Sequence, residues 1–169
     1  MNKALIDTDV FSELGKGVDP KVIGNGKTYR RSHGRYTIST ITVMEIVRGL
    51  QRTQSARRLQ TFLASIATEE ILSFDEPAAE LAGRIAGELE RSGQPIGVAD
   101  PMIAAIALHH GLELVTGNTA HFQRIQMLGH PLTLVNWRES KEPGERRRGH
   151  AVWPLASEIL NGATWNHVD

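Results

Sequence analysis

The chain has 169 residues, as many acidic as basic residues, and no cysteine. This length suits a single domain, and the lack of cysteine excludes disulfide bonds, iron–sulfur clusters and thiolate zinc sites. No apolar run approaches the roughly 20 residues that a membrane span needs, and the N-terminal apolar run is too short for a signal peptide. We therefore expect a cytoplasmic protein without a membrane-spanning segment.

The charges are unevenly distributed although they sum to zero. Between Lys16 and Arg58 the only acids are Asp19 and Glu45, whereas acids outnumber bases between Leu59 and Asp100. A basic region beside an acidic one can pair with it, can remain solvated, or can bind an anion such as RNA.

The first third of the chain predicts two short strands. Residues 4–6 form an apolar run typical of a buried strand, and residues 36–39 alternate and are β-branched, which is typical of a second strand. Residues 15–34 contain several glycines and lysines, so we expect a loop there.

The middle of the chain predicts helices around a third strand. Residues 41–50 and 55–67 carry apolar residues at helical spacing, and Ser39 or Thr40 can cap the first of these helices. The predicted third strand covers residues 71–74, and a further helix covers residues 77–91.

The last part of the chain predicts another helix and two more strands. Asp100 begins a helix that Gly111 ends, and residues 112–116 and 132–135 are typical of strands. Strands that alternate with helices predict an α/β fold with a central parallel sheet covered on both faces. We expect one domain over residues 1–138 and a C-terminal tail of unknown role over residues 139–169, with a short helix near Leu155.

Polar side chains follow the predicted strands. Asp7 and Asp9 come directly after the first strand, Glu45 lies on the helix after the second, and Asn118 follows the fourth. Asp100 opens the helix before the fourth strand. Since ligands of open parallel sheets bind beyond the carboxyl ends of the strands, these residues can converge.

Converging carboxylates favour a divalent cation. Two carboxylates about 4 Å apart repel by roughly 4 kcal/mol at an effective dielectric constant near 20, and a bound cation removes that cost. Hard oxygen ligands favour Mg²⁺ or Mn²⁺ over zinc. Such an ion activates water and stabilises charge on phosphoryl oxygens, which indicates phosphodiester hydrolysis.

Each acid also has a structural interpretation. Asp7 can cap a turn, Asp9 can cap a helix, and Asp100 before Pro101 fits an ordinary helix cap. Glu45 lies among apolar neighbours within a basic region, so a purely structural role explains it less well. The histidines, His121 among them, lack a spacing typical of metal ligands.

Four segments in order resemble the PIN-domain family, particularly the VapC-type toxins of bacterial toxin–antitoxin pairs. They are Leu5-Ile6-Asp7-Thr8-Asp9-Val10 with Ser12-Glu13-Leu14, Ile41-Thr42-Val43-Met44-Glu45-Ile46-Val47-Arg48-Gly49-Leu50, Ile96-Gly97-Val98-Ala99-Asp100-Pro101-Met102-Ile103-Ala104-Ala105, and Leu114-Val115-Thr116-Gly117-Asn118 with His121-Phe122. The resemblance covers roughly residues 3 to 137.

The resemblance implies a Rossmann-like three-layer sandwich and metal-dependent endoribonuclease activity. Asp7, Glu45 and Asp100 would be the catalytic acids that hold Mg²⁺ or Mn²⁺. Thr8 and Thr116 would support these acids or hold metal-bound water. The family often has a fourth acid where this chain has Asn118, which leaves a second metal ion in doubt.

The resemblance also implies binding partners. A VapB-type antitoxin would lie in the acidic groove, RNA would be the substrate, and the protein would form a homodimer. Arg31, Arg35 and Arg48 are candidate contacts for RNA phosphates.

Two other functions remain open from the sequence. Asp7-Thr8-Asp9-Val10 after a strand also resembles the nucleophile motif of haloacid-dehalogenase-like phosphatases, but no acidic pair follows the fourth strand. A PIN-like domain with a weak metal site could instead bind RNA or an antitoxin without cleaving RNA.

Overall fold

Five short parallel strands lie between two groups of helices in residues 1–139, the part of the chain that the computed structural model describes. The strands are β1 (Ala4–Ile6), β2 (Thr37–Ser39), β3 (Glu70–Leu72), β4 (Glu113–Val115) and β5 (Leu134–Val135). The helices are α1 (Thr8–Lys16), α2 (Pro20–His33), α3 (Thr40–Arg52), α4 (Ala56–Ile66), α5 (Glu76–Arg91), α6 (Ala99–His109) and α7 (Thr119–Met127).

The strands form two hydrogen-bonded ladders. One has the order β1-β4-β5 and the other pairs β2 with β3, and every pairing is parallel. β2 lies beside β1, and the Tyr29 hydroxyl joins them, since it donates to Ala4 O at 2.9 Å and lies 3.0 Å from Thr37 Oγ1. The expected parallel α/β fold is confirmed, although its strands are divided between two ladders.

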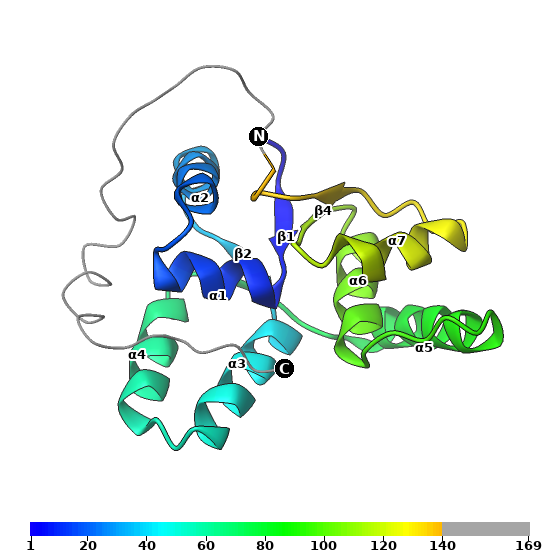
Figure 1. The fold of residues 1–169 in the computed structure, drawn as a ribbon, viewed down its shortest axis with the longest axis horizontal. Helices are drawn as coiled ribbons and strands as arrows, with labels where there is room; N and C mark the ends of the chain where they lie inside the picture. The colour runs from blue at the N-terminus through cyan, green and yellow to red at the C-terminus, as the bar shows by residue number, and fades with distance from the viewer. Residues whose placement is uncertain (140–169) are drawn as a thin grey trace.

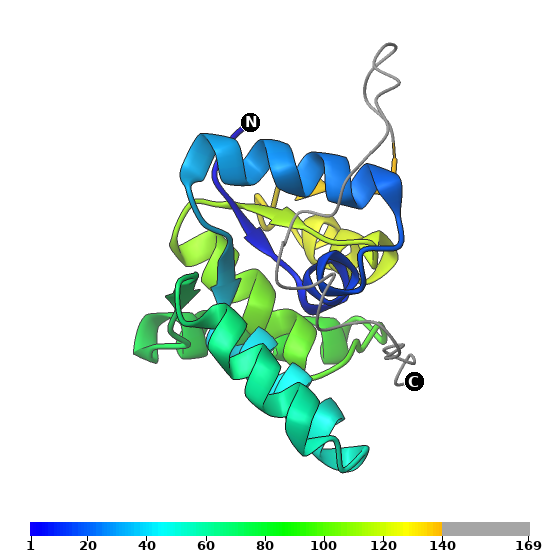
Figure 2. The ribbon, with the colours of Figure 1, turned by 90° about the vertical axis from the view of Figure 1, so that its left-hand side faces the viewer.

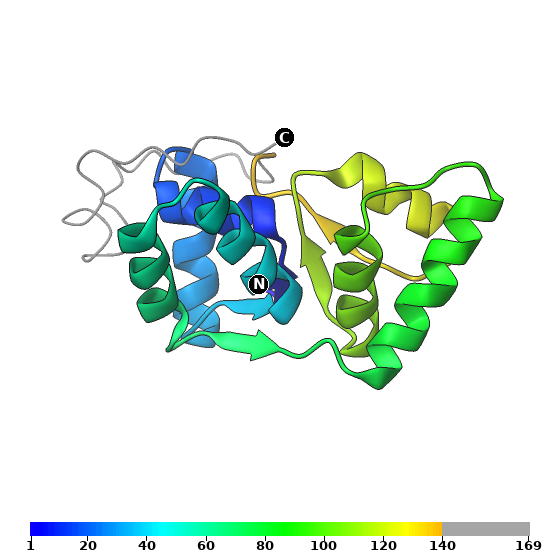
Figure 3. The ribbon, with the colours of Figure 1, turned by 90° about the horizontal axis from the view of Figure 1, so that it is seen from below.

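Apolar side chains fill both faces of the strands. Leu5 and Leu114 face a core shared with α5, α6 and α7, whereas Ile6 and Val115 face a second core shared with α1 to α4. Successive residues of a strand point to opposite faces, so these three-residue strands contribute to both cores. Figures 1 and 3 show the helix groups on opposite sides of the strands.

The expected loop over residues 15–34 is wrong, because most of it forms helix α2. Asp19 caps this helix by accepting hydrogen bonds from Lys21 N and Val22 N, with Pro20 in the first turn. A Cβ at Gly26 would lie 2.4 Å from a methyl carbon of Leu14. This glycine thus permits close helix packing and does not end a helix. Figure 2 shows α2 running along one end of the domain.

The other predicted helices are found with small shifts of their ends. Ser39, rather than Thr40, caps α3, and Asp75 caps α5. Helix α7 was not predicted, and it places residues 119–127 against α6. No helix within residues 1–139 is both long enough and apolar enough to cross a bilayer. The predicted short helix near Leu155 lies outside the described residues.

Candidate active site at the carboxyl ends of β1 and β4

Asp7 lies at the carboxyl end of β1, and its side chain is buried, with 5% of its surface exposed. Oδ1 accepts a hydrogen bond from Thr8 N at 2.7 Å, and Oδ2 accepts one from Thr116 Oγ1 at 2.8 Å. The pKa of Asp7 is raised to about 8, mainly by burial and also by the nearby charges of Asp9 and Asp100, against the lowering effect of these hydrogen bonds. A carboxyl group in these surroundings favours either a proton or a bound cation.

Glu45 reaches the same region from helix α3. Thr8 Oγ1 donates to Glu45 Oε2 at 2.5 Å, while the backbone of Thr8 begins α1. Glu45 is half-buried, and Thr8 is the residue that connects it to Asp7. Its position at the second turn of α3 follows from the cap at Ser39, which starts the helix directly after β2.

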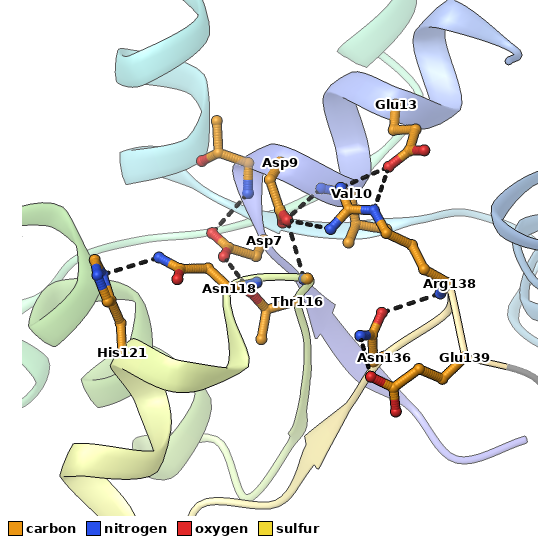
Figure 4. Close-up of polar contacts among 12 residues, drawn as sticks. Asp7, Asp9, Val10, Glu13, Thr116, Asn118, His121, Asn136, Arg138 and Glu139 are labelled. Atoms are coloured by element: carbon orange, nitrogen blue, oxygen red, sulfur yellow. Dashed lines mark hydrogen bonds and ion pairs between the residues drawn. The ribbon is translucent and has the colours of Figure 1, made fainter. Parts of the chain in front are cut away.

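Asp100 lies in the first turn of α6 and does not cap that helix. Its Oδ2 atom lies 2.7 Å from His121 Nδ1, and the same nitrogen lies 2.9 Å from Asn118 Nδ2. Burial raises the pKa of Asp100, and the nearby Asp9 adds to this rise against the opposing effect of His121. Figure 4 shows the contact between Asn118 and His121.

Polar contacts of hydrogen-bond length connect the three acids that were predicted to hold the metal. Starting from Glu45, they pass through Thr8, Asp7, Thr116, Asn118 and His121 to Asp100. No group of three acidic or histidine side chains in residues 1–139 is close enough to form a complete metal cage. The site is therefore a set of polar groups that water or substrate oxygens would have to complete.

Asp9 lies beside this series of contacts and binds Arg138. Its Oδ2 atom accepts from Arg138 Nη1 at 2.9 Å and from Gly117 N at 3.0 Å, and Oδ1 accepts from Val10 N. Arg138 also binds Glu13 through Nε and Nη2, at 2.7 and 2.6 Å. Asp9 does not cap α1, since Asp7 occupies that position.

Two side chains of this region were missed from the sequence. His121 lies 21 residues from Asp100, and Arg138 lies 129 residues from Asp9. The motif containing His121-Phe122 indicated that this segment matters, but its spacing gave no metal-ligand pattern. Nothing in the sequence pairs Arg138 with α1.

The three predicted arginines lie in different places. Arg48 is exposed on α3 one turn after Glu45, on the same side of that helix. Arg35 precedes β2 and helps to lower the pKa of Glu70 against the effect of burial, and Glu70 forms an ion pair with Lys3 before β1. Arg31 is in the last turn of α2, near the same amino ends of the strands. Of these three arginines, only Arg48 thus lies near one of the predicted acids, which is Glu45.

Sequence comparison decides the family of the chain. The model of the PIN domain family matches residues 4–127. This chain belongs to the PIN-domain family. The expected resemblance is therefore confirmed, and the matched segment contains every acid described above.

The relatives of this PIN domain include named ribonucleases. A tRNA(fMet)-specific endonuclease VapC of Shigella flexneri is 32% identical over 126 residues, covering 74% of this chain and 93% of the relative. Ribonuclease VapC10 of Mycobacterium tuberculosis is 30% identical over 148 residues, covering 85% of this chain and 98% of the relative.

Solved structures give the same fold. The DNA-bound VapBC structure from Salmonella typhimurium aligns with a TM-score of 0.67 at 30% identity, covering 81% of this chain and 99% of that chain. VapBC-1 from nontypeable Haemophilus influenzae aligns with a TM-score of 0.62 at 28% identity, covering 80% of this chain and 98% of that chain.

Proposed function

We propose that this PIN domain is a divalent-metal-dependent endoribonuclease and the toxin of a toxin–antitoxin pair. The proposal rests on the burial and the raised pKa of Asp7. This carboxyl group is almost completely buried beside two other acids, and its pKa is raised to about 8. A group that is costly to ionise without a counterion, at the carboxyl ends of parallel strands, fits a cation site better than a structural role.

The side chains present fit Mg²⁺ or Mn²⁺. Asp7, Glu45 and Asp100 supply hard oxygen donors, and Thr8 and Thr116 supply hydroxyl groups that fix two of these acids. Mg²⁺ commonly binds through one or two carboxylates, several waters and substrate phosphates, so an incomplete protein cage is compatible with it. A bound divalent ion would supply an activated water and stabilise negative charge on the phosphoryl oxygens.

The chain's own residues then position the reacting groups. Asp7 and Asp100 would hold the ion, and Thr116 orients the Asp7 carboxylate by donating a hydrogen bond to Oδ2. Glu45 is held by Thr8 through one oxygen, so its other oxygen can accept a proton from the attacking water. Arg48 can bind an RNA phosphate near Glu45, whereas Arg31 and Arg35 can reach only RNA that extends across the domain.

RNA cleavage by purified protein tests the activity. We expect Mg²⁺ or Mn²⁺ to support cleavage, EDTA to abolish it, and Asp7→Asn to reduce it by at least about 100-fold. Since two relatives are named for tRNA(fMet), that RNA is the first substrate to use. Asp75→Asn is the matched control, because Asp75 caps α5 as Asp7 caps α1. Equal cleavage by wild type and Asp7→Asn would refute the proposed site.

Growth of a bacterial host tests the toxin role. We expect induction of the wild-type protein to arrest growth and to create discrete new RNA 5′ ends, and we expect Asp7→Asn to do neither.

RNA binding by the wild-type protein without cleavage in any divalent metal would support the non-enzymatic alternative instead. The phosphatase alternative requires Asp9 as an acid/base, but Arg138, Gly117 and Val10 already occupy its carboxylate.

The antitoxin partner is part of the same proposal. Several similar solved structures are VapBC or toxin–antitoxin complexes, so we infer that a VapB-type protein binds this chain. A basic side chain of the antitoxin would neutralise Asp7 and Asp100 in the acidic groove, and the complex would contain a homodimer of this chain. Co-expression with a VapB-type antitoxin encoded beside this protein should restore growth of the host. Light scattering of the complex should report two copies of this chain.

A further inference from the structure

The His121 side chain contacts both Asp100 and Asn118 through one ring nitrogen. Its Nδ1 atom is 2.7 Å from Asp100 Oδ2 and 2.9 Å from Asn118 Nδ2. The three side chains come from the first turn of α6, the residue before α7, and the first turn of α7. The His121 side chain is 39% exposed and that of Asp100 is 18% exposed, so solvent ions can reach their contact.

The hydrogen bonds of this group cannot all be made at once. An imidazole Nδ1 carries either one proton or one lone pair. If it donates to Asp100, it cannot also accept from the Asn118 amide. If the amide is turned by 180°, Asn118 Oδ1 faces Nδ1, and two oxygens then compete for one proton. In both arrangements the three polar groups lack a full set of partners.

A divalent cation would satisfy these groups together. Adjacent ligands of an octahedral ion at about 2.1 Å lie roughly 3 Å apart, which is close to the two separations of 2.7 and 2.9 Å. With the amide turned, Asp100 Oδ2 and Asn118 Oδ1 would both lie within about 3 Å of His121 Nδ1, so the group would present three lone-pair donors that a shared ion can bind. The two added donors, an imidazole nitrogen and an amide oxygen, are neutral, so the site differs from the all-acid set expected from the family.

We propose that His121 Nδ1 is a direct ligand of the divalent ion, with Asp100 Oδ2 and Asn118 Oδ1, and that it makes this site prefer Mn²⁺ over Mg²⁺. The inference rests on the proposed metal-dependent function and adds a ligand to it. Imidazole nitrogen suits transition metals, whereas Mg²⁺ binds oxygen ligands and loses water reluctantly. The preference therefore follows from the nitrogen donor.

Electron spin-echo spectroscopy of the full chain loaded with Mn²⁺ tests the ligand directly, without measuring activity. We expect the wild-type spectrum to show coupling of the manganese electrons to a histidine nitrogen, which ¹⁵N-histidine labelling identifies. His121→Gln should lose this coupling. His130→Gln is the matched control and should keep it, because His130 contacts Glu88 away from the site.

Calorimetry of the same proteins tests the metal preference. His121→Gln should lower Mn²⁺ affinity by at least about tenfold while lowering Mg²⁺ affinity less. Wild-type protein that binds Mn²⁺ with Asp100-dependent affinity but no nitrogen coupling would overturn the role of His121 and leave the proposed nuclease site standing. Mn²⁺ binding that survives both Asp7→Asn and Asp100→Asn, or no binding at all, would overturn the inference and the proposed metal site together.

Discussion

The buried carboxyl group of Asp7 has a raised pKa, which lowers the stability of the metal-free fold at neutral and alkaline pH. Because its folded pKa is about 8 and its ordinary value is 3.8, the folded protein holds a proton that the unfolded chain releases between these values. The stabilisation from this proton is fully present below about pH 4 and is lost as the pH rises through 8. The group that would bind the metal thus weakens the empty protein at neutral and alkaline pH.

Asp7→Asn should therefore stabilise the metal-free protein. The amide can still accept from Thr8 N and can donate to Thr116 Oγ1, but it never ionises. Thermal unfolding in EDTA should show a midpoint that exceeds that of wild type by many degrees at about pH 9 and by much less at about pH 5. Asp75→Asn should show no such pH dependence. An equal shift at both pH values would mean that Asp7 is not protonated in the fold.

Metal affinity should depend on pH for the same reason. In the proposed site the ion would bind the Asp7 carboxylate, so below the pKa of about 8 each bound ion would displace one proton. We expect the affinity for Mn²⁺ to rise about tenfold per pH unit from about pH 6 to 8 and then to level off. Calorimetry in buffers of different ionisation enthalpy measures the proton release. Affinity that is constant over this range would contradict the raised pKa of Asp7.

At the scale of secondary structure, the Tyr29 hydroxyl holds β2 beside β1. It contacts both Ala4 N and Ala4 O, as well as Thr37 Oγ1, within a fully buried environment. The Tyr36 hydroxyl is also buried, but it has no hydrogen-bond partner among the described residues. The two tyrosines therefore form a matched pair for testing what joins the two ladders.

Tyr29→Phe should lower the free energy of unfolding by about 1–3 kcal/mol, because it leaves buried polar groups of β1 and β2 unpaired. Tyr36→Phe should be neutral or slightly stabilising, since it removes a buried hydroxyl that lacks a partner. Urea unfolding followed by circular dichroism measures both. A similar loss in the two variants would show that the Tyr29 hydrogen bonds are not what couples the ladders.

The segment after β5 is attached to α1 by Arg138. The guanidinium group binds Asp9 and Glu13 on successive turns of that helix and lies directly over Gly117. A Cβ at Gly117 would be 1.2 Å from Arg138 Nη1 and 2.7 Å from Asp9 Oδ2. The φ of Gly117 is not in the left-handed region, so the backbone conformation does not explain the glycine. The position of the Arg138 guanidinium group explains it instead.

Gly117→Ala should consequently destabilise the protein through Arg138. We expect a loss of about 1–2 kcal/mol in the free energy of unfolding, as for a broken charge-assisted contact. In an Arg138→Ala background the same substitution should cost less, because the vacated space accepts the methyl group. A double-mutant cycle measured by urea unfolding gives this coupling. Additive effects would show that Arg138 does not account for the glycine.

At the scale of the whole domain, local sequence patterns predicted most of the strands and helices. The strands around Leu5, Ile38 and Leu114 and the helix over residues 77–91 have clear apolar patterns, and the structure confirms them. Helix α2 escaped prediction because Gly26 was interpreted as a loop residue, although it packs against Leu14. Short-range patterns do not reveal which small residues serve close packing.

The candidate site was predictable only in part. Asp7, which directly follows a strand, and Asp100, which opens the helix before the fourth strand, could be assigned to one edge of the sheet, and the structure places them there with Glu45 connected through Thr8. The contacts of His121 and Arg138 depend on how α7 and the end of β5 return to α6 and α1. Residue spacing along the chain does not predict these long-range contacts, so only the structure reveals them.

The pairing of β1 with β4 has a consequence for the cell that makes this protein. The backbone of Asp7 hydrogen-bonds to Val115 O, and its carboxylate to Thr116, so the first and last parts of the site meet only after β4 has been synthesised. At about 5–20 residues per second, the ribosome needs roughly 5–20 s to pass from Asp7 to Val115. Under the proposed function, a growing or prematurely terminated chain that lacks β4 would lack a complete site and would not cleave the RNA around it.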